Sequence, residues 1–155
     1  MTLTISPARL RDLNALRKME KVVFSEDAWP VIDLMAALFI PGGIHYKAEI
    51  DGNIVGFISA ENNLFENVTW VTTVGVIPEY RNQGVGCSLM KAVEDVVTRP
   101  MIKLCVRKSN SGAIHLYEKL GYHTQNTRRK YYSDGEDAFV MAKTKPVMVV
   151  PPPDL

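Results

Sequence analysis

The sequence predicts an α+β or mixed α/β domain, in which helices cover a β-sheet. The predicted element order, β-α-α-β-β-β-α-β-α-β-β, is neither a series of hairpins nor a repeat of strand–helix–strand units. Two turn signals, at 51–52 and 133–135, each join β-prone runs into a hairpin. A strand, a glycine-containing turn and a helix follow one another over 74–97. A chain of 155 residues is long enough to bury one core.

The first quarter of the chain predicts one strand and two helices. A short strand covers 3–6, and a helix begins near Pro7 and ends near Phe24. Apolar residues three or four positions apart form its buried face: Leu10, Leu13, Leu16 and Met19 or Val23. A loop follows over 25–30, and a second helix over 31–39 ends at the Pro41-Gly42-Gly43 sequence.

The middle of the chain predicts three strands and a helix. Asp51-Gly52 is a strong hairpin signal between the strands 44–50 and 53–60. The strand over 68–77 is rich in Val and Thr, which favour β-structure. The helix after this strand has an apolar stripe made of Leu89, Val93, Val96 and Val97.

The last third predicts a buried strand over 101–106 and then a helix whose start is capped within 109–112. This helix presents Ala113, Tyr117 and Leu120 on one face. Strands over 122–132 and 136–143 then form a hairpin. We expect a single domain over 1–145, followed by an extended, poorly ordered tail over 146–155 that contains three consecutive prolines.

Composition and charge are those of an ordinary globular protein and exclude several classes. Apolar residues make up 46% and charged residues 23%, and the net charge is +1, so we expect no nucleic-acid partner. The apolar runs are far shorter than the about 18 residues of a membrane span, and the N-terminus lacks a secretory signal. Cys87 and Cys105 have no metal-ligand spacing, and the histidines His45, His115 and His123 are scattered. We therefore expect a cytoplasmic protein without a metal site, whose histidines lie at the surface or serve structure.

The most informative segment is the turn that enters the helix after 74–77. Gly84 and Gly86 allow the backbone to approach a ligand closely. The helix directs its free N–H groups and the positive end of its dipole at the same place. Such a turn binds anions, and a pyrophosphate suits it. The pattern is neither a Walker A motif nor the dinucleotide fingerprint, and a plain strand–turn–helix corner is the structural alternative.

Three motifs carry a resemblance to a known family. Arg81-x-x-Gly84-x-Gly86 resembles motif A of the GCN5-related N-acetyltransferases (GNAT). The segment 104–122 resembles motif B of the protein N-terminal acetyltransferases, which include an enzyme that acetylates the N-terminal alanine of a ribosomal protein. The segment 130–138 resembles their final hairpin, so that the similarity spans about residues 3–143. It implies a mostly antiparallel sheet that is splayed at an acetyl-coenzyme A site.

The resemblance also implies which residues hold acetyl-coenzyme A. The backbone of Val74, Gly75 and Val76 would pair with the pantetheine arm. The turn and first helical residues would bind the pyrophosphate: Arg81, Asn82, Gln83, Gly84, Val85, Gly86 and Cys87. Asn110 lies where the family has an asparagine that contacts the cofactor. Asn110 is also a good helix N-cap, so that both interpretations stay open at this stage.

For the chemistry, the resemblance implies that Tyr117 contacts the cofactor and gives a proton or hydrogen bond to the leaving thiolate. A buried core tyrosine is the alternative. Glu26 would orient the substrate amine or relay its proton, unless it is an ordinary exposed carboxylate. Some relatives have Glu or His at the position of Cys105 and Tyr at the position of Trp70, and this chain departs at both. We expect a buried, inert Cys105 thiol, because Leu104 and Val106 flank it.

The departures at Cys105 and Trp70 favour an α-amine as the acceptor over a lysine. At pH 7, deprotonation costs about 1 kcal/mol for an α-amine of pKa about 7.7–8.0, and about 4.6 kcal/mol for lysine. The smaller cost of deprotonating an α-amine can be met without a strong base.

The resemblance implies a substrate site formed by two loops. Its expected members are Phe24, Glu26, Trp29, Tyr131 and Tyr132. The alternative for the two adjacent tyrosines is a strand in which one is buried and the other covers the surface.

The sequence thus predicts an N-acetyltransferase that transfers acetyl directly, in a ternary complex, to the α-amine of protein or peptide N-termini. Two alternatives stay open: a GNAT that acetylates lysine or a small amine, and a non-catalytic acyl-coenzyme A-binding accessory subunit. The sequence leaves open whether the protein acts as a monomer, as a homodimer or with an auxiliary subunit.

Overall fold

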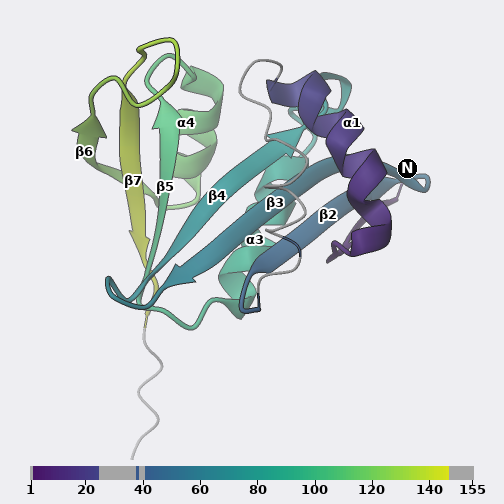
Figure 1. The fold of residues 1–155 in the computed structure, drawn as a ribbon, viewed down its shortest axis with the longest axis horizontal. Helices are drawn as coiled ribbons and strands as arrows, with labels where there is room; N and C mark the ends of the chain where they lie inside the picture. The colour runs from purple at the N-terminus through teal and green to yellow at the C-terminus, as the bar shows by residue number, and fades with distance from the viewer. Residues whose placement is uncertain (1, 25–37, 39–40, 147–155) are drawn as a thin grey trace, which may run out of the picture.

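The computed structural model describes residues 2–24, 38 and 41–146 (Figure 1). This part of the chain forms a seven-stranded sheet in the order β1-β2-β3-β4-β5-β7-β6. The strands are β1 (Leu3–Pro7), β2 (Ile44–Ile50), β3 (Asn53–Asn63), β4 (Val68–Val76), β5 (Met101–Arg107), β6 (His123–Arg128) and β7 (Ala138–Thr144).

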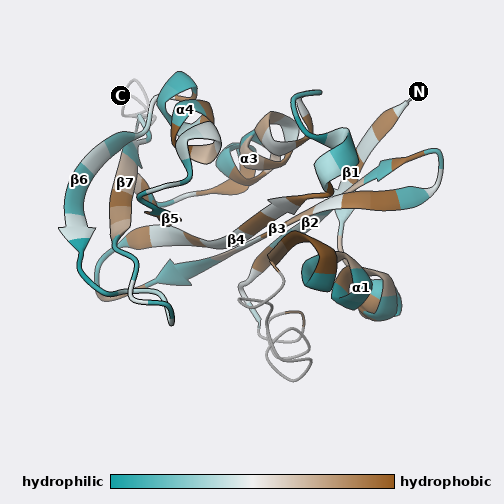
Figure 2. Cartoon of the chain, turned by 90° about the horizontal axis from the view of Figure 1, so that it is seen from above, coloured by the Kyte–Doolittle hydropathy of each residue, from teal (hydrophilic) through white to brown (hydrophobic). Residues whose placement is uncertain are grey.

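The helices cover both faces of the sheet. A 3-10 turn, η1 (Leu10–Asp12), leads into α1 (Leu13–Phe24) on one face. The helices α3 (Val85–Val96) and α4 (Ser111–Lys119) lie together on the opposite face (Figure 2). A second 3-10 turn, η3 (Pro78–Tyr80), connects β4 to α3. The predicted mixed α/β fold is confirmed.

One break in the sheet positions the site. The strands β1 to β4 pair antiparallel in sequence order, and β7 pairs antiparallel with both β5 and β6. In contrast, β4 and β5 run parallel and pair only over 68–71 and 101–104. Beyond these pairs the two strands diverge, as Figure 1 shows. The splayed, mostly antiparallel sheet that the resemblance implies is therefore present.

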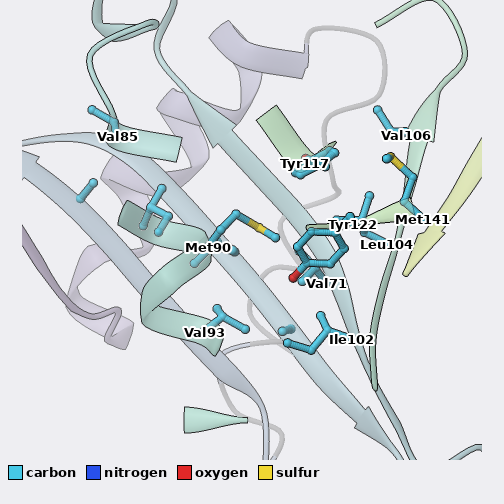
Figure 3. Close-up of a cluster of buried hydrophobic side chains, with 14 of the residues drawn as sticks. Val71, Val85, Met90, Val93, Ile102, Leu104, Val106, Tyr117, Tyr122 and Met141 are labelled. Carbon is cyan, nitrogen blue, oxygen red and sulfur yellow. The ribbon is translucent and has the colours of Figure 1, made fainter. Parts of the chain in front are cut away.

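The main core lies between the sheet and α3 and α4. Figure 3 shows Met90 and Val93 from α3 against Tyr122 and against strand residues such as Leu104. A smaller cluster, formed by Leu16, Met19 and Phe57, packs α1 on the other face. Hydrophobic burial of this kind supplies most of the stability of such a layered fold.

Two glycines allow helices to approach the sheet closely from opposite faces. A Cβ at Gly56 on β3 would lie 3.0 Å from both Leu89 Cδ1 and Val85 Cγ1 of α3. A Cβ at Gly75 on β4 would lie 3.0 Å from Val23 Cγ1 and 3.1 Å from Phe24 Cε2, both in α1. Gly75 thus has a packing role beside its predicted contact with a ligand.

Several predicted details are wrong. Leu10 lies in η1 rather than on the buried helix face and is 48% exposed, because α1 begins only at Leu13. Val96 is 46% exposed, because it ends α3 while Val97 turns inward. Strand β6 ends at Arg128, so that Tyr131 and Tyr132 lie in a loop and not in a strand.

The other predicted elements agree within a few residues, with β3 continuing three residues past Ala60. The predicted second helix (31–39) and the tail beyond Pro146 lie outside the described residues, apart from Leu38 in the former. No helix in the described residues is long and apolar enough to cross a membrane.

Candidate active site

The turn from β4 into α3 has the backbone geometry of an anion site. Asn82 and Gly84 have left-handed φ angles of 61° and 83°, and Gly84 is the N-cap of α3. Alternating left- and right-handed residues direct successive N–H groups into one concavity. The amides of Val85 and Gly86 open the helix and have no acceptor within it.

Side chains of the same turn hold its shape. The Arg81 Nε donates to the Val76 carbonyl over 3.1 Å, and the Gln83 Nε2 donates to the Glu79 carbonyl over 3.2 Å. No atom lies within 4 Å of a Cβ built at Gly84, so its surroundings are open to a ligand. A Cβ at Gly86 would lie 3.2 Å from Leu116 Cδ2, so this glycine allows α3 to approach α4.

A β-bulge marks the point at which β4 leaves β5. Ser59 pairs with Thr73 and Ala60 pairs with Val71, which leaves Thr72 as the extra residue of β4. The Thr72 Oγ1 donates to the Ser59 carbonyl over 3.1 Å and fixes the bulge. Bulges often occur beside active sites, where they redirect side chains and end pairing.

The gap beyond the bulge is a chamber of about 240 Å³, here called the inner chamber. It is lined by Phe24, Val71, Thr72, Thr73, Val74, Leu104, Cys105, Val106, Arg107, Asn110, Ala113, Tyr117 and Tyr132. The sequence-predicted residues Phe24, Val74, Asn110, Tyr117 and Tyr132 are therefore brought together from α1, β4, the start of α4, α4 itself and the β6–β7 loop.

Tyr117 lies on α4 between the core and the inner chamber. It is 5% exposed, and its ring contacts Tyr122 edge to face at a centroid distance of 6.1 Å. Burial, with a smaller contribution from Tyr132, raises the pKa of Tyr117 well above that of an ordinary tyrosine. The phenol therefore stays protonated and available as a donor at neutral pH. The alternative of a buried core tyrosine is confirmed, and because Tyr117 also lines the inner chamber, its contact with a cofactor stays a prediction.

Asn110 caps α4, because its Oδ1 accepts from the Ala113 amide over 3.2 Å. The N-cap interpretation is confirmed. Since Asn110 also lines the inner chamber, a ligand contact stays a prediction.

A second, larger cavity of about 740 Å³ adjoins the inner chamber and is here called the outer pocket. It is lined by Glu61, Trp70, Val71, Thr72, Cys105, Arg128, Tyr131, Tyr132 and Ser133. The two cavities share Val71, Thr72, Cys105 and Tyr132. They thus form one groove that crosses the end of the β4–β5 pairing.

The prediction that Cys105 is buried is wrong, because the residue is partly exposed. Residues along β5 alternate between the faces of the sheet, so that Leu104 and Val106 enter the core while Cys105 points the other way and is partly exposed. Burial nevertheless raises the pKa of Cys105, against the opposing effects of Arg128 and a hydrogen bond with Tyr131. A protonated thiol is a weak nucleophile, which agrees with an inert residue.

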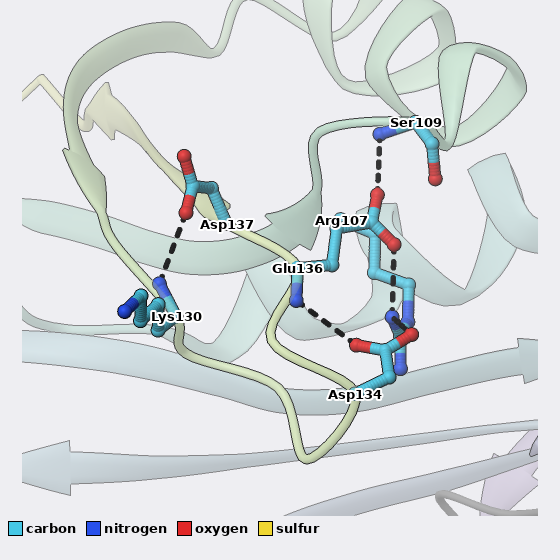
Figure 4. A network of polar contacts seen from close by, with 6 residues as sticks. All are labelled: Arg107, Ser109, Lys130, Asp134, Glu136 and Asp137. Atoms are coloured by element: carbon cyan, nitrogen blue, oxygen red, sulfur yellow. Dashed lines mark hydrogen bonds and ion pairs between the residues drawn. The ribbon is translucent and has the colours of Figure 1, made fainter.

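Arg107 holds the β6–β7 loop over the groove (Figure 4). Its Nη1 lies 2.8 Å from Asp134 Oδ2 and 2.9 Å from Glu136 Oε2, and its guanidinium carbon lies 4.1 Å from the Tyr132 ring centroid. The Ser109 amide donates to Glu136 Oε1 over 2.8 Å. A hydrogen bond from the Ser109 side chain, followed by Arg107 and then by the Ser109 amide, lowers the pKa of Glu136, so that the carboxylate is ionised at neutral pH. The network fixes Tyr132 between the two cavities.

A second arginine, Arg128, lines the outer pocket. The Arg128 guanidinium carbon lies 5.0 Å from the Trp70 ring centroid and 5.7 Å from that of Tyr131. The Lys103 Nζ lies 5.7 Å from the Trp70 ring. Tyr131 in turn meets Tyr132 edge to face, with the centroids 5.0 Å apart.

Sequence reasoning gave no role to Thr72, Arg107 or Arg128. The role of Thr72 in the bulge depends on the register between β3 and β4, which the sequence of one strand does not show. Arg107 directly follows the predicted strand and precedes the capping segment, which was a usable signal. Glu26 and Trp29 lie outside the described residues. His115 and His123 are exposed, and His45 contacts Ser59 and Phe57, as expected for surface and structural roles.

Comparisons with known proteins agree with this geometry. A profile described as the acetyltransferase (GNAT) family matches residues 11–122. An N-alpha-acetyltransferase of Sulfurisphaera tokodaii is 35% identical over 89% of this chain and 90% of that protein. The catalytic subunit ard1 of the N-terminal acetyltransferase A complex of Schizosaccharomyces pombe is 32% identical over 90% and 84%. The crystal structure of the ribosomal-protein-S18-alanine N-acetyltransferase from Escherichia coli superposes with a TM-score of 0.83 and 28% identity, covering 92% and 94%.

Proposed function

Because the chain belongs to the acetyltransferase (GNAT) family and is an acetyl-CoA-dependent acetyltransferase, we propose that it acetylates the α-amine of protein or peptide N-termini. The acetyl group passes directly to the amine in a ternary complex. The single observation that carries the choice of acceptor is the lining of the inner chamber. Among the described residues that form it, none is Asp, Glu or His.

The residues present fit acetyl-CoA. The amides of the α3 turn, from Asn82 to Cys87, would hold the pyrophosphate, and the open space at Gly84 admits it. On β4, residues 73–76 pair with β3 along one edge only, since the pairing with β5 ends at Val71. The other edge has backbone groups that would pair with the pantetheine arm. When bound, the cofactor supplies the activated acetyl thioester.

Tyr117 supplies the proton-donating group. We assign its phenol to donate a hydrogen bond or proton to the sulfur that leaves when the amine attacks. The raised pKa of Tyr117 keeps this proton in place at neutral pH. The buried ring packs against Tyr122, which limits the positions that the hydroxyl can occupy.

An α-amine fits a chamber whose described lining contains no Asp, Glu or His. Its deprotonation at pH 7 costs about 1 kcal/mol, against about 4.6 kcal/mol for lysine. Water and weak acceptors, such as the Thr72 hydroxyl at the bulge, meet the smaller demand. The names of the relatives support the same acceptor.

The peptide substrate would bind in the outer pocket. With about 740 Å³ it is large enough for several residues that follow the reacting amine. Tyr131 and Tyr132 close one side, and Phe24 walls the inner chamber from α1. Glu26 and Trp29 are assigned to the same site by the family resemblance.

A peptide panel tests the proposal. Each peptide is offered with a free N-terminus, and matched controls have a blocked N-terminus with an internal lysine. We expect incorporation of labelled acetyl into the free α-amines only. Equal labelling of the blocked, lysine-containing peptides would contradict the assignment of the acceptor.

A further inference from the structure

We propose that Arg128 makes the outer pocket select peptides with an acidic side chain at the second or third residue. This inference rests on the proposed function and names the substrate class of the same site.

Arg128 is held in place by aromatic rings rather than by carboxylates. Its guanidinium lies over Trp70 at 5.0 Å and over Tyr131 at 5.7 Å. Guanidinium groups stack on aromatic faces and keep their N–H edges available for other partners. The stack therefore orients the cation without using its donors.

The charge of Arg128 is not neutralised by the described residues. Its contacts there are the two ring stacks, and no ion pair joins it to a carboxylate. Arg107, close by in the same region, contrasts with it, because Asp134 and Glu136 both lie within 2.9 Å of Arg107 Nη1. Among the described residues, Arg107 is thus paired within the structure, while Arg128 has no carboxylate partner.

Other charged residues also lie in or near the outer pocket. Glu61 lines the pocket from β3, opposite Trp70 in the strand register, whereas Arg128 lines it from β6. Glu66 accepts a hydrogen bond from Trp70 Nε1 over 3.2 Å. Lys103 adds a second cation beside the Trp70 ring. Arg128 on β6 and Lys103 on β5 thus place two cations beside the Trp70 ring, to which a carboxylate would be drawn.

The position of the acidic side chain follows from the two cavities. Arg128 lines the outer pocket and not the inner chamber, where the amine must react. An extended chain advances about 3.3–3.6 Å per residue, so we place the side chain that enters the adjoining outer pocket at the second or third residue. Asp or Glu there offers the planar, bidentate acceptor that a guanidinium prefers.

Matched peptides test the selection. Pairs that differ only by Asp or Asn at the second or third residue are compared by kcat/KM. We expect the Asp peptide to be favoured about fivefold to tenfold, mainly through KM, and the advantage to shrink as salt rises from 50 to 500 mM.

Variants assign the preference to one residue. Arg128→Gln should remove the ratio between the Asp and Asn peptides, and Arg128→Lys should keep part of it. Arg129→Gln removes the neighbouring charge, which does not line the pocket, and should keep the ratio. Arg128→Glu should invert the preference toward a Lys-containing peptide.

The outcomes separate the two proposals. Acetylation of the Asn peptide without an advantage for Asp, or a ratio that survives in Arg128→Gln, would overturn the selectivity and leave the proposed function intact. If neither peptide is acetylated at a free N-terminus, the proposed function fails, and the selectivity fails with it.

Discussion

The two ends of the groove are built in different ways. The proposed cofactor end would use backbone: the amides of the α3 turn and the edge of β4 that no described strand pairs with beyond Val71. The acceptor end uses side chains from distant parts of the chain, such as Trp70, Cys105, Arg128 and Tyr132. In this proposal, a ligand common to the whole family would be held by backbone groups, which every residue has. The variable partner meets groups that single substitutions can change.

The largest expected effect is the loss of coenzyme A binding at the cofactor end. Gly84→Glu introduces a side chain with a negative charge at the anion site and at a φ of 83°, so we expect binding of coenzyme A to be abolished. Calorimetric titration measures this loss. Lys91→Glu changes charge at an exposed position of α3 and should bind normally. An unchanged isotherm for Gly84→Glu would place the pyrophosphate elsewhere.

The next effect concerns chemistry where the two ends meet. Tyr117→Phe should lower kcat about tenfold to a thousandfold while the affinity for coenzyme A changes little, because only the proton donor is removed. Tyr122→Phe is the matched control, since its hydroxyl donates to Glu94 over 3.1 Å outside the groove. It should cost about 1 kcal/mol of stability and leave kcat near wild type. Equal kcat in both variants would remove Tyr117 from the mechanism.

A smaller effect is expected at the loop over the acceptor end. Arg107→Gln removes two ion pairs and the stack on Tyr132, so we expect KM for the peptide to rise about threefold to tenfold. Lys108→Gln, at the next residue, serves as the control. If the affinity for coenzyme A falls more than the affinity for the peptide, Arg107 acts at the cofactor end instead.

The smallest expected effect concerns the shape of the pH–rate profile. Burial raises the pKa of Tyr117, so the phenol stays protonated up to and beyond the ordinary tyrosine pKa of about 10. The rate should rise as the α-amine loses its proton, level off above about pH 8 and show no fall caused by Tyr117 below about pH 10. Tyr117→Phe should show the same dependence on pH, with a lower rate at every pH. A falling limb near pH 9 that the variant lacks would show that Tyr117 ionises early.

The same contrast explains how much the sequence could predict. The Asp51-Gly52 hairpin and the α3 turn depend on neighbouring residues, and both form as predicted. The bulge at Thr72 depends on the register with β3, and the stack of Arg128 on Trp70 joins residues 58 positions apart. Cys105 shows the limit within one strand, because its apolar neighbours indicate a buried strand but not which face each residue takes. Turns that depend on neighbouring residues could be predicted from the sequence, whereas contacts between residues far apart in the chain could not.

Gly56 and Gly75 set a mechanical condition on the whole enzyme. At these neighbouring strands the partition between α3 and α1 is a single layer of backbone, with contacts near 3 Å to any added methyl group on either side. One helix follows the turn that we propose binds the cofactor, and the other carries Phe24, which lines the inner chamber. A shift of either helix is therefore resisted by the same layer of backbone, which couples the positions of the two sides of the site.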